Sequence, residues 1–315
     1  MLHFGNMQTY VTRRAAKAAR GSENIRRARY NRQKRNMQKN RQTRTGSGRV
    51  TLTDKLKIGV SLASLRMPLR RAISTASRLG ASAVEIEARG ELRPSEMTET
   101  GLRQLRKLLD DASLKVCSVS LPTRRGYNVL EGLDQRISAT KAAMRMAYQL
   151  RAPVLVNRIG RVKDDPESAD WKLFVEALHD LAQHGDRVGA TFAARTGSEE
   201  GEVLARLLKE VPAGGIGIDF DPAALIINNF SATEALQALG PHVRQFRARD
   251  GVRDFSQGRG VETPLGRGTA DFPTLFGLLE DFSFRGYYTI DREDSQDPLT
   301  DISNAISFLQ SVMTG

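Results

Sequence analysis

The sequence has 315 residues, 40% of them hydrophobic, and a formal net charge of +12. Residues 1–49 hold 14 lysines and arginines against one acidic residue, Glu23, leaving 34 of the 48 basic and 35 of the 36 acidic side chains for the rest. The body of the chain is therefore nearly neutral, which argues against a broad nucleic-acid-binding surface, and no stretch approaches the roughly 18 apolar residues of a membrane span.

Residues 1–50 are expected to be a basic, disordered extension. They contain almost no aliphatic side chains beyond alanine, so they cannot bury enough apolar surface to offset the entropy lost on ordering. A secretory signal is excluded because no apolar segment follows the paired arginines. Two interpretations stay open. The extension is either an arm attracted to nucleic acid or anionic lipid, or an inert segment upstream of a start at Met37.

From Lys57 onward, short apolar segments alternate with amphipathic ones. Strands are expected at 57–62, 83–88, 115–121, 153–158, 190–195, 215–221, 243–250 and 286–293. Apolar residues at three- and four-residue spacing predict helices that include 69–80, 137–150, 272–282 and 302–313. Eight such repeats indicate a closed (β/α)8 TIM barrel over residues 51–315. The alternative is an open doubly wound sheet, but no Gly-x-Gly-x-x-Gly motif follows the first strand.

One face of the expected strands is unusually polar. Side chains alternate between faces along a strand, which places on that face Glu85, Glu87, Arg195, Asp219, Asp221, Arg247, Arg249 and Asp291. In a barrel this face is the lumen, and its mouth at the strand C-termini carries the active site. An unpaired buried charge costs several kcal/mol, so the arginines are expected to pair with carboxylates.

Two further segments carry weaker signals. The single cysteine, Cys117, cannot form an internal disulfide, which is compatible with a reducing compartment. We expect a cytoplasmic protein in which Cys117 faces the helix layer. Residues 258–268 are rich in glycine, yet they lack the Gly-Lys-Ser/Thr ending of a phosphate loop. They are expected to form a mobile loop on the barrel rim.

Several stretches resemble the xylose isomerase-like family of sugar phosphate isomerases and epimerases. They include "LGASAVEIEA" (79–88), "IGIDFDPAAL" (216–225) and "PLGRGTADFPTLFGLLEDFSFRGYYTIDRE" (264–293). The resemblance covers residues 55–312 and implies a TIM barrel. In the family a divalent metal is held by Glu, Asp, His and Glu at the ends of strands five to eight. The corresponding residues here are Arg195, Asp221, Arg247 and Asp291.

These replacements change the expected chemistry. A guanidinium stays protonated and has no acceptor atom, so we expect neither a metal ion nor another cofactor. The expected ligand is a sugar or sugar phosphate, bound by Arg195, Arg247, Arg249, Arg253 and Glu85. Asp221 and Asp291 are candidates for acid–base catalysis, with a role as counter-ions of the arginines as the alternative.

Two other function classes remain as alternatives. The first is a catalytically inactive barrel that serves as a binding or interaction protein, with a lumen held together by salt bridges. The second is a nucleic-acid enzyme, because the same family includes an endonuclease class. That class needs a cluster of several metal-binding histidines, whereas the histidines of this chain lie elsewhere, at His3, His179, His184 and His242. Nucleic acid is therefore expected to bind only through the basic extension.

Overall fold

The computed structural model describes residues 57–211, 215–254 and 258–314. The basic extension expected at 1–50, and its boundary with the barrel, lie outside these residues. The description below concerns the barrel alone.

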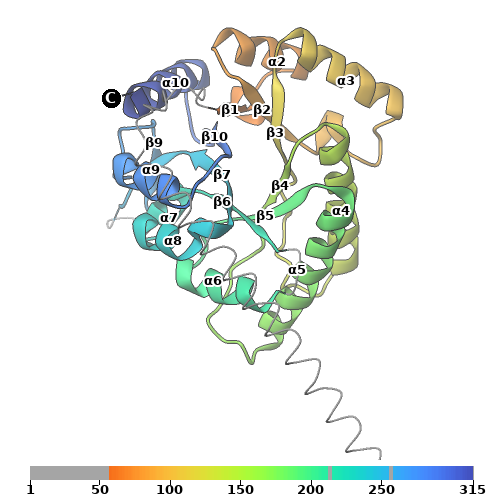
Figure 1. The fold of residues 1–315 in the computed structure, drawn as a ribbon, viewed down its shortest axis with the longest axis vertical. Helices are drawn as coiled ribbons and strands as arrows, with labels where there is room; N and C mark the ends of the chain where they lie inside the picture. Colours follow the sequence, from red (N-terminus) through yellow and green to blue (C-terminus); the bar gives the residue numbers. More distant parts are fainter. Residues whose placement is uncertain (1–56, 212–214, 255–257, 315) are drawn as a thin grey trace, which may run out of the picture. The chain divides into compact units, whose positions relative to one another are not determined.

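Eight parallel strands close into a barrel in the order β1-β10-β7-β6-β5-β4-β3-β2 (Figure 1). Their bounds are β1 (Ile58–Ser61), β2 (Ala83–Glu87), β3 (Lys115–Ser120), β4 (Val154–Asn157), β5 (Thr191–Arg195), β6 (Gly217–Phe220), β7 (Val243–Ala248) and β10 (Tyr287–Ile290). Each lies inside a segment expected to be a strand, and the predicted TIM barrel is confirmed.

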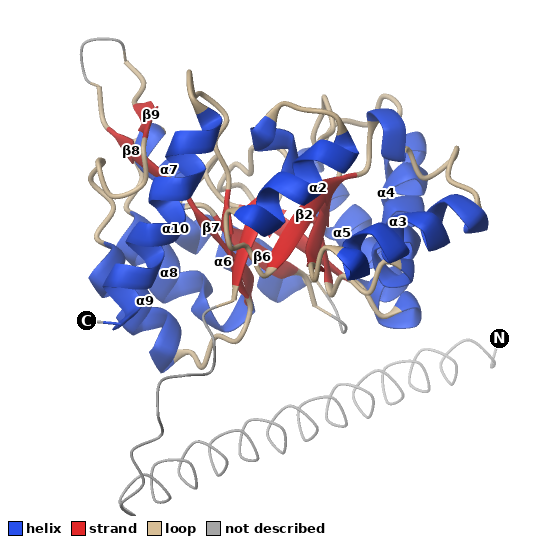
Figure 2. Cartoon of the chain, turned by 90° about the horizontal axis from the view of Figure 1, so that it is seen from above, coloured by secondary structure: helices blue, strands red, loops and turns tan. Residues whose placement is uncertain are grey.

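Helices surround the strands on the outside of the barrel (Figure 2). They are α2 (Leu69–Arg78), α3 (Glu99–Asp111), α4 (Leu133–Gln149), α5 (Ala169–Val188), α6 (Gly201–Glu210), α7 (Pro222–Ile227), α8 (Ala232–Leu239), α9 (Phe272–Asp281) and α10 (Pro298–Thr314), with short 3-10 helices η2 (Leu62–Leu65), η3 (Gly90–Leu92) and η4 (Gly240–His242). Thr98, Ser168 and Asp271 each accept the N–H of the residue three positions later. Such caps satisfy N–H groups that have no partner inside the helix. No helix among the described residues is long and apolar enough to cross a membrane.

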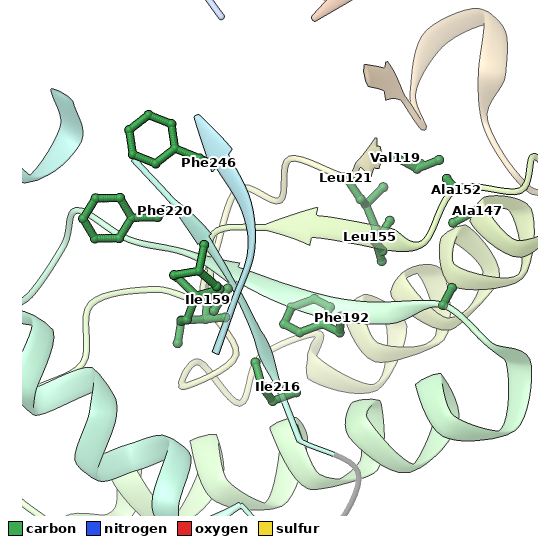
Figure 3. Packing of buried hydrophobic residues seen from close by; sticks show 14 of the residues in the cluster. Val119, Leu121, Ala147, Ala152, Leu155, Ile159, Phe192, Ile216, Phe220 and Phe246 are labelled. Atoms are coloured by element: carbon green, nitrogen blue, oxygen red, sulfur yellow. The ribbon is translucent and has the colours of Figure 1, made fainter. Parts of the chain in front are cut away.

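The hydrophobic core lies between the strands and the helices (Figure 3). Phe220 and Phe246, on the paired strands β6 and β7, stack with ring centroids 5.9 Å apart. Phe246 also meets Phe276 of α9 edge to face at 5.6 Å. Aromatic pairs of this kind contribute about 0.5–1.5 kcal/mol beyond the area they bury. They fix the outward face of β7, and therefore the inward direction of Arg247.

An irregularity in β3 reverses the expected direction of Cys117. Val84 of β2 pairs with Val116, but Glu85 pairs with Ser118, so Cys117 is an extra residue on its strand. Its Sγ lies 3.6 Å from the hydroxyl of Thr289, and a Cβ at Gly59 would lie only 2.8 Å from that sulfur. Cys117 therefore points into the lumen, and the expectation that it faces the helices is wrong. A bulge shifts the alternation by one residue, which the sequence pattern does not reveal.

The segment after β7 differs from the expected strand end and rim loop. β7 ends at Ala248, and a short antiparallel hairpin follows, formed by β8 (Asp250–Val252) and β9 (Val261–Thr263). Figure 2 shows this hairpin beside α7. The Asp250 carboxylate accepts the N–H groups of Gly251, Gly266, Gly268 and Ala270 at 2.8–3.1 Å. One buried side chain thus holds the glycine-rich segment in place.

Candidate functional site

The centre of the barrel is occupied by the guanidinium of Arg247. This side chain is fully buried, at 0% exposure. Its Nη1 and Nη2 donate to the two oxygens of Glu85 at 3.0 and 2.7 Å. Its Nε donates to Asp219 at 2.9 Å, and Nη1 also donates to Asp291 at 2.8 Å. One cation therefore joins carboxylates from β2, β6 and the end of β10.

Neutral side chains complete the bonding of these carboxylates. Ser118 donates to Glu85 at 2.7 Å, and Ser64 donates to Asp291 at 2.7 Å. Burial alone would raise the pKa of Glu85, but Arg247 brings that pKa below its ordinary value. The pKa of Asp291 is also lowered, because Arg247 and Arg195 outweigh the effect of its burial. Both groups are therefore charged at neutral pH.

Arg195 at the end of β5 links this cluster to the solvent side. Its Nε donates to Asp219 at 3.0 Å, and its Nη1 lies 3.8 Å from Asp291 and 3.4 Å from Glu293. The side chain is 11% exposed, whereas Arg247 is inaccessible. Of these two arginines, only Arg195 can touch a ligand directly.

Arg249 and Asp221 form a second pair beside the first cluster. Nη1 of Arg249 donates to Asp221 at 2.8 Å, and its Nε donates to Glu262 of β9 at 2.9 Å. The other oxygen of Asp221 accepts the N–H of Ala224 and caps α7. Burial would raise the pKa of Asp221, yet Arg249 lowers it below the ordinary value. Both carboxylate oxygens are engaged in structural bonds.

The structure thus gathers most of the residues that the sequence singled out. Glu85, Arg195, Arg247 and Asp291 form one cluster, and Arg249 and Asp221 adjoin it through Glu293. Arg253 is not brought to this cluster. It is exposed, and the bond recorded for it runs to the carbonyl of Phe230 at 3.3 Å.

A cavity of about 320 Å³ opens above the cluster, at the C-terminal end of the barrel. Its wall combines polar and apolar surface in similar amounts, and it carries both signs of charge. Carboxylates come from Glu85, Glu87, Asp291 and Glu293, guanidiniums from Arg158 and Arg195, hydroxyls and an amide from Ser61, Ser120, Thr123 and Asn157, and the apolar part from Ala63, Pro122 and Val156. Such a wall suits a small, polyhydroxylated molecule better than an apolar one.

Glu87 is one of the two cavity carboxylates that the predicted site omitted; the other is Glu293. Glu87 ends β2, two residues beyond Glu85, and is half-buried. Within the described part of the chain, no hydrogen bond or ion pair holds its carboxylate. Burial raises the pKa of Glu87; Arg89 opposes this, and the nearby Glu85 adds to it. Strand alternation had placed Glu87 in the lumen, but its freedom from partners could not be read from the sequence.

The residues present do not fit the divalent metal that the resemblance implies. The oxygens of Glu85, Asp219 and Asp291 that face the barrel centre accept hydrogen bonds from Arg247. Asp219 also accepts from Arg195, and Glu85 also accepts from Gln245. A hard cation needs free oxygen or imidazole ligands. Across residues 57–211, 215–254 and 258–314, no group of three or more His, Cys, Asp and Glu side chains is arranged to hold a metal ion.

Comparisons with known proteins agree with this architecture. A sequence profile described as "Xylose isomerase-like TIM barrel" matches residues 73–312. An inosose dehydratase from Geobacillus thermodenitrificans is 24% identical, over 61% of this chain and 74% of that protein. Among solved structures, a xylose isomerase domain protein from Planctomyces limnophilus has a TM-score of 0.72 at 23% identity, covering 82% of this chain and 97% of its own. A sugar phosphate isomerase/epimerase from Parabacteroides distasonis has a TM-score of 0.65 at 15% identity, covering 84% and 96%.

Proposed function

The chain belongs to the xylose isomerase-like TIM barrel family, and from that premise we propose that it binds a sugar or sugar phosphate without a metal ion. One observation carries the proposal. Arg247 donates hydrogen bonds to the inward-facing oxygens of Glu85, Asp219 and Asp291, and a cavity of about 320 Å³ lies open beside them. Small-molecule sites measure roughly 300–1,000 Å³, so the cavity has the volume for a single sugar ring.

The ligand contacts would come from the cavity wall. Ser61, Ser120 and Asn157 offer hydrogen bonds to sugar hydroxyls, and Arg195 offers a fixed positive charge. Its Nε is held by Asp219, so little reorganisation accompanies binding. A preorganised cation of this kind stabilises negative charge that develops on a substrate oxygen.

Glu87 is the group best suited to move a proton. In sugar isomerisation, a base removes a proton from the carbon next to a carbonyl and returns it to the former carbonyl carbon, while the hydroxyl proton passes to the former carbonyl oxygen; in epimerisation, water or a second acid delivers a proton to the opposite face. The negative charge moves to the carbonyl oxygen, where Arg195 would stabilise it. A raised pKa brings a carboxylate closer to the working range of a general base, and that of Glu87 is raised. The acid–base roles expected for Asp221 and Asp291 stay predictions, and their lowered pKa values favour counter-ions.

The second candidate is a barrel that binds its ligand without turning it over. The observation in its favour is that Asp221 and Asp291, at positions of the family's metal ligands, are both committed to arginines. Binding and turnover therefore need separate tests.

Binding is tested by thermal-shift titration of chelator-treated protein with a panel of sugars and sugar phosphates. A ligand at one hundred times its Kd should stabilise the wild type by about 2.7 kcal/mol. Arg195→Gln should lose this stabilisation. Arg206→Gln is the matched control, because Arg206 lies on α6, pairs with Asp164 and does not line the cavity. Absence of any shift at millimolar ligand, or a shift that requires an added divalent ion, would contradict the proposal.

Turnover is tested by incubating protein and ligand in D2O and following the sugar by NMR. Exchange of a carbon-bound proton for deuterium in the wild type, lost in Glu87→Gln, supports isomerase or epimerase chemistry. Binding without exchange supports the second candidate.

A further inference from the structure

Three arginines converge on one oxygen at the rim of the cavity. Oε1 of Glu293 accepts from Arg158 at 3.0 Å, from Arg249 at 3.3 Å and from Arg195 at 3.4 Å. Glu293 lies in the loop between β10 and α10, and the arginines come from β5 and from the segments after β4 and β7. A carboxylate offers about four acceptor positions over two oxygens, yet these donors all address one of them. The three guanidiniums are thus only partly satisfied by Glu293.

The side chain of Glu293 is held less firmly than its backbone. Its carbonyl accepts from Arg66 at 2.8 Å, and the next residue, Asp294, donates its N–H to Glu262 at 2.7 Å. The Glu293 side chain, in contrast, is 46% exposed. Ion pairs at such exposure contribute little to stability. The carboxylate can therefore rotate into solvent while the loop stays in place.

Two of the three arginines would remain in position without Glu293. Arg195 is also held by Asp219, and Arg249 by Asp221 and Glu262. Arg158 differs, because its side chain is 57% exposed and Glu293 is the partner recorded for it. Two fixed cations and one adaptable cation thus surround a space that a carboxylate now fills, and Arg158, Arg195 and Glu293 all line the cavity.

We infer that Arg158, Arg195 and Arg249 form an oxyanion subsite that Glu293 occupies in the free protein. The ligand, which on the function proposed above is a sugar, carries a carboxylate or phosphate group that displaces the Glu293 carboxylate. Glu293 acts as an internal competitor, and it keeps the arginine charges neutralised when no ligand is bound.

The charges around the subsite favour one type of oxyanion. Asp221, Glu262 and Asp291 already lie against these arginines. Replacing the single negative charge of Glu293 by a carboxylate leaves the local charge unchanged, whereas a phosphate dianion adds a negative charge near these carboxylates. A sugar acid is therefore expected to bind more tightly than the matching sugar phosphate, and both more tightly than the neutral sugar.

The test is calorimetric titration at fixed ionic strength with D-glucuronate, glucose 6-phosphate and D-glucose, together with inorganic phosphate. Removing the competitor in Glu293→Gln should lower the Kd of D-glucuronate about tenfold, the size expected when a few half-exposed ion pairs no longer compete. Adding Arg158→Gln to that variant should reverse most of the gain. The Kd of D-glucose should change much less between these proteins than the Kd of D-glucuronate.

Asp294→Asn is the matched control. It removes the same charge one residue along the loop, from an exposed side chain that is not a partner of these arginines. An equal gain in Asp294→Asn would show a general charge effect and overturn the subsite. The subsite is also refuted, with the sugar-binding proposal intact, if D-glucose binds the wild type but Glu293→Gln leaves the Kd of D-glucuronate unchanged. If no sugar binds any variant, yet Glu293→Gln binds inorganic phosphate about tenfold more tightly than the wild type does, the subsite stands and the sugar-binding proposal is wrong.

Discussion

Replacing Arg247 by methionine tests whether its guanidinium holds the barrel centre together. The substitution keeps much of the side-chain length and removes the charge that Glu85, Asp219 and Asp291 share. In the variant, Asp219 still accepts a hydrogen bond from Arg195, and Asp291 still accepts one from Ser64. Glu85 keeps only the neutral donors Ser118 and Gln245. The variant therefore buries at least one carboxylate without a cation.

Breaking a buried ion pair by removing one partner costs about 3–5 kcal/mol. For a domain of this size that corresponds to a fall in melting temperature of roughly 6–20 °C. The loss should depend on pH in a defined direction. Without Arg247, burial raises the folded-state pKa of Glu85 above its unfolded value, so the variant recovers stability as the pH falls and this carboxyl takes up a proton. In the wild type the lowered pKa of Glu85 has the opposite effect, and its stabilisation fades in acid.

The assay is urea unfolding at pH 8 and pH 5, followed by circular dichroism and by the fluorescence of Trp171, the single tryptophan. Arg206→Met serves as the control for loss of an exposed ion pair. It should lower the free energy of unfolding by less than about 1 kcal/mol. A double variant, Arg247→Met with Glu85→Gln, should recover part of the loss, because it removes the unpaired charge. If Arg247→Met costs no more than the control at pH 8, the idea of a charge-paired centre fails.

Two further predictions concern buried groups outside the cavity. Burial raises the pKa of Glu199 to about 8, and its carboxyl accepts the N–H of Val162. Between about pH 5 and pH 8 the folded state therefore retains a proton that the unfolded state has lost. The free energy of unfolding should fall by on the order of 2–4 kcal/mol over this range, relative to that of Glu199→Gln. Urea titrations of both proteins across this range check the difference, and a constant difference would contradict the assignment. Burial also raises the pKa of Cys117 to about 12, so its thiol should react with a disulfide reagent only as the protein unfolds, and rapid modification of the native protein would show that the lumen is open to the reagent.

The sequence was sufficient for the barrel and for the direction of most lumen residues. Periods of two and of three to four residues report which face of an element is buried, and this placed Arg247 and Asp219 inside. The period fails where the backbone is irregular. The extra residue at Cys117 depends on the register of β3 with β2, and the hairpin after Arg249 depends on the pairing of β8 with β9.

The identity of the ion-pair partners was beyond sequence reasoning. The arginines were expected to pair with carboxylates, but the sequence did not indicate that Arg247 binds Glu85, 162 positions away, together with Asp219 and Asp291. Glu87 and Glu293 gave no distinct signal, because what sets them apart is their exposure and the number of cations around them. Both properties arise only after the barrel has closed.

The long separation between Glu85 and Arg247 has a consequence for how the barrel opens. Their contact forms only when β2 and β7 belong to the same closed ring, and β10 must join to bring Asp291. An intermediate with a compact core but an open ring would hold charged groups in a low-dielectric interior without their partners. Such states lie high in free energy. Partial opening of the ring is therefore rare, and unfolding of the native barrel through such open states is slow. The internal arginine thereby makes ring closure a single cooperative event, although contacts this distant in sequence also slow the closure itself.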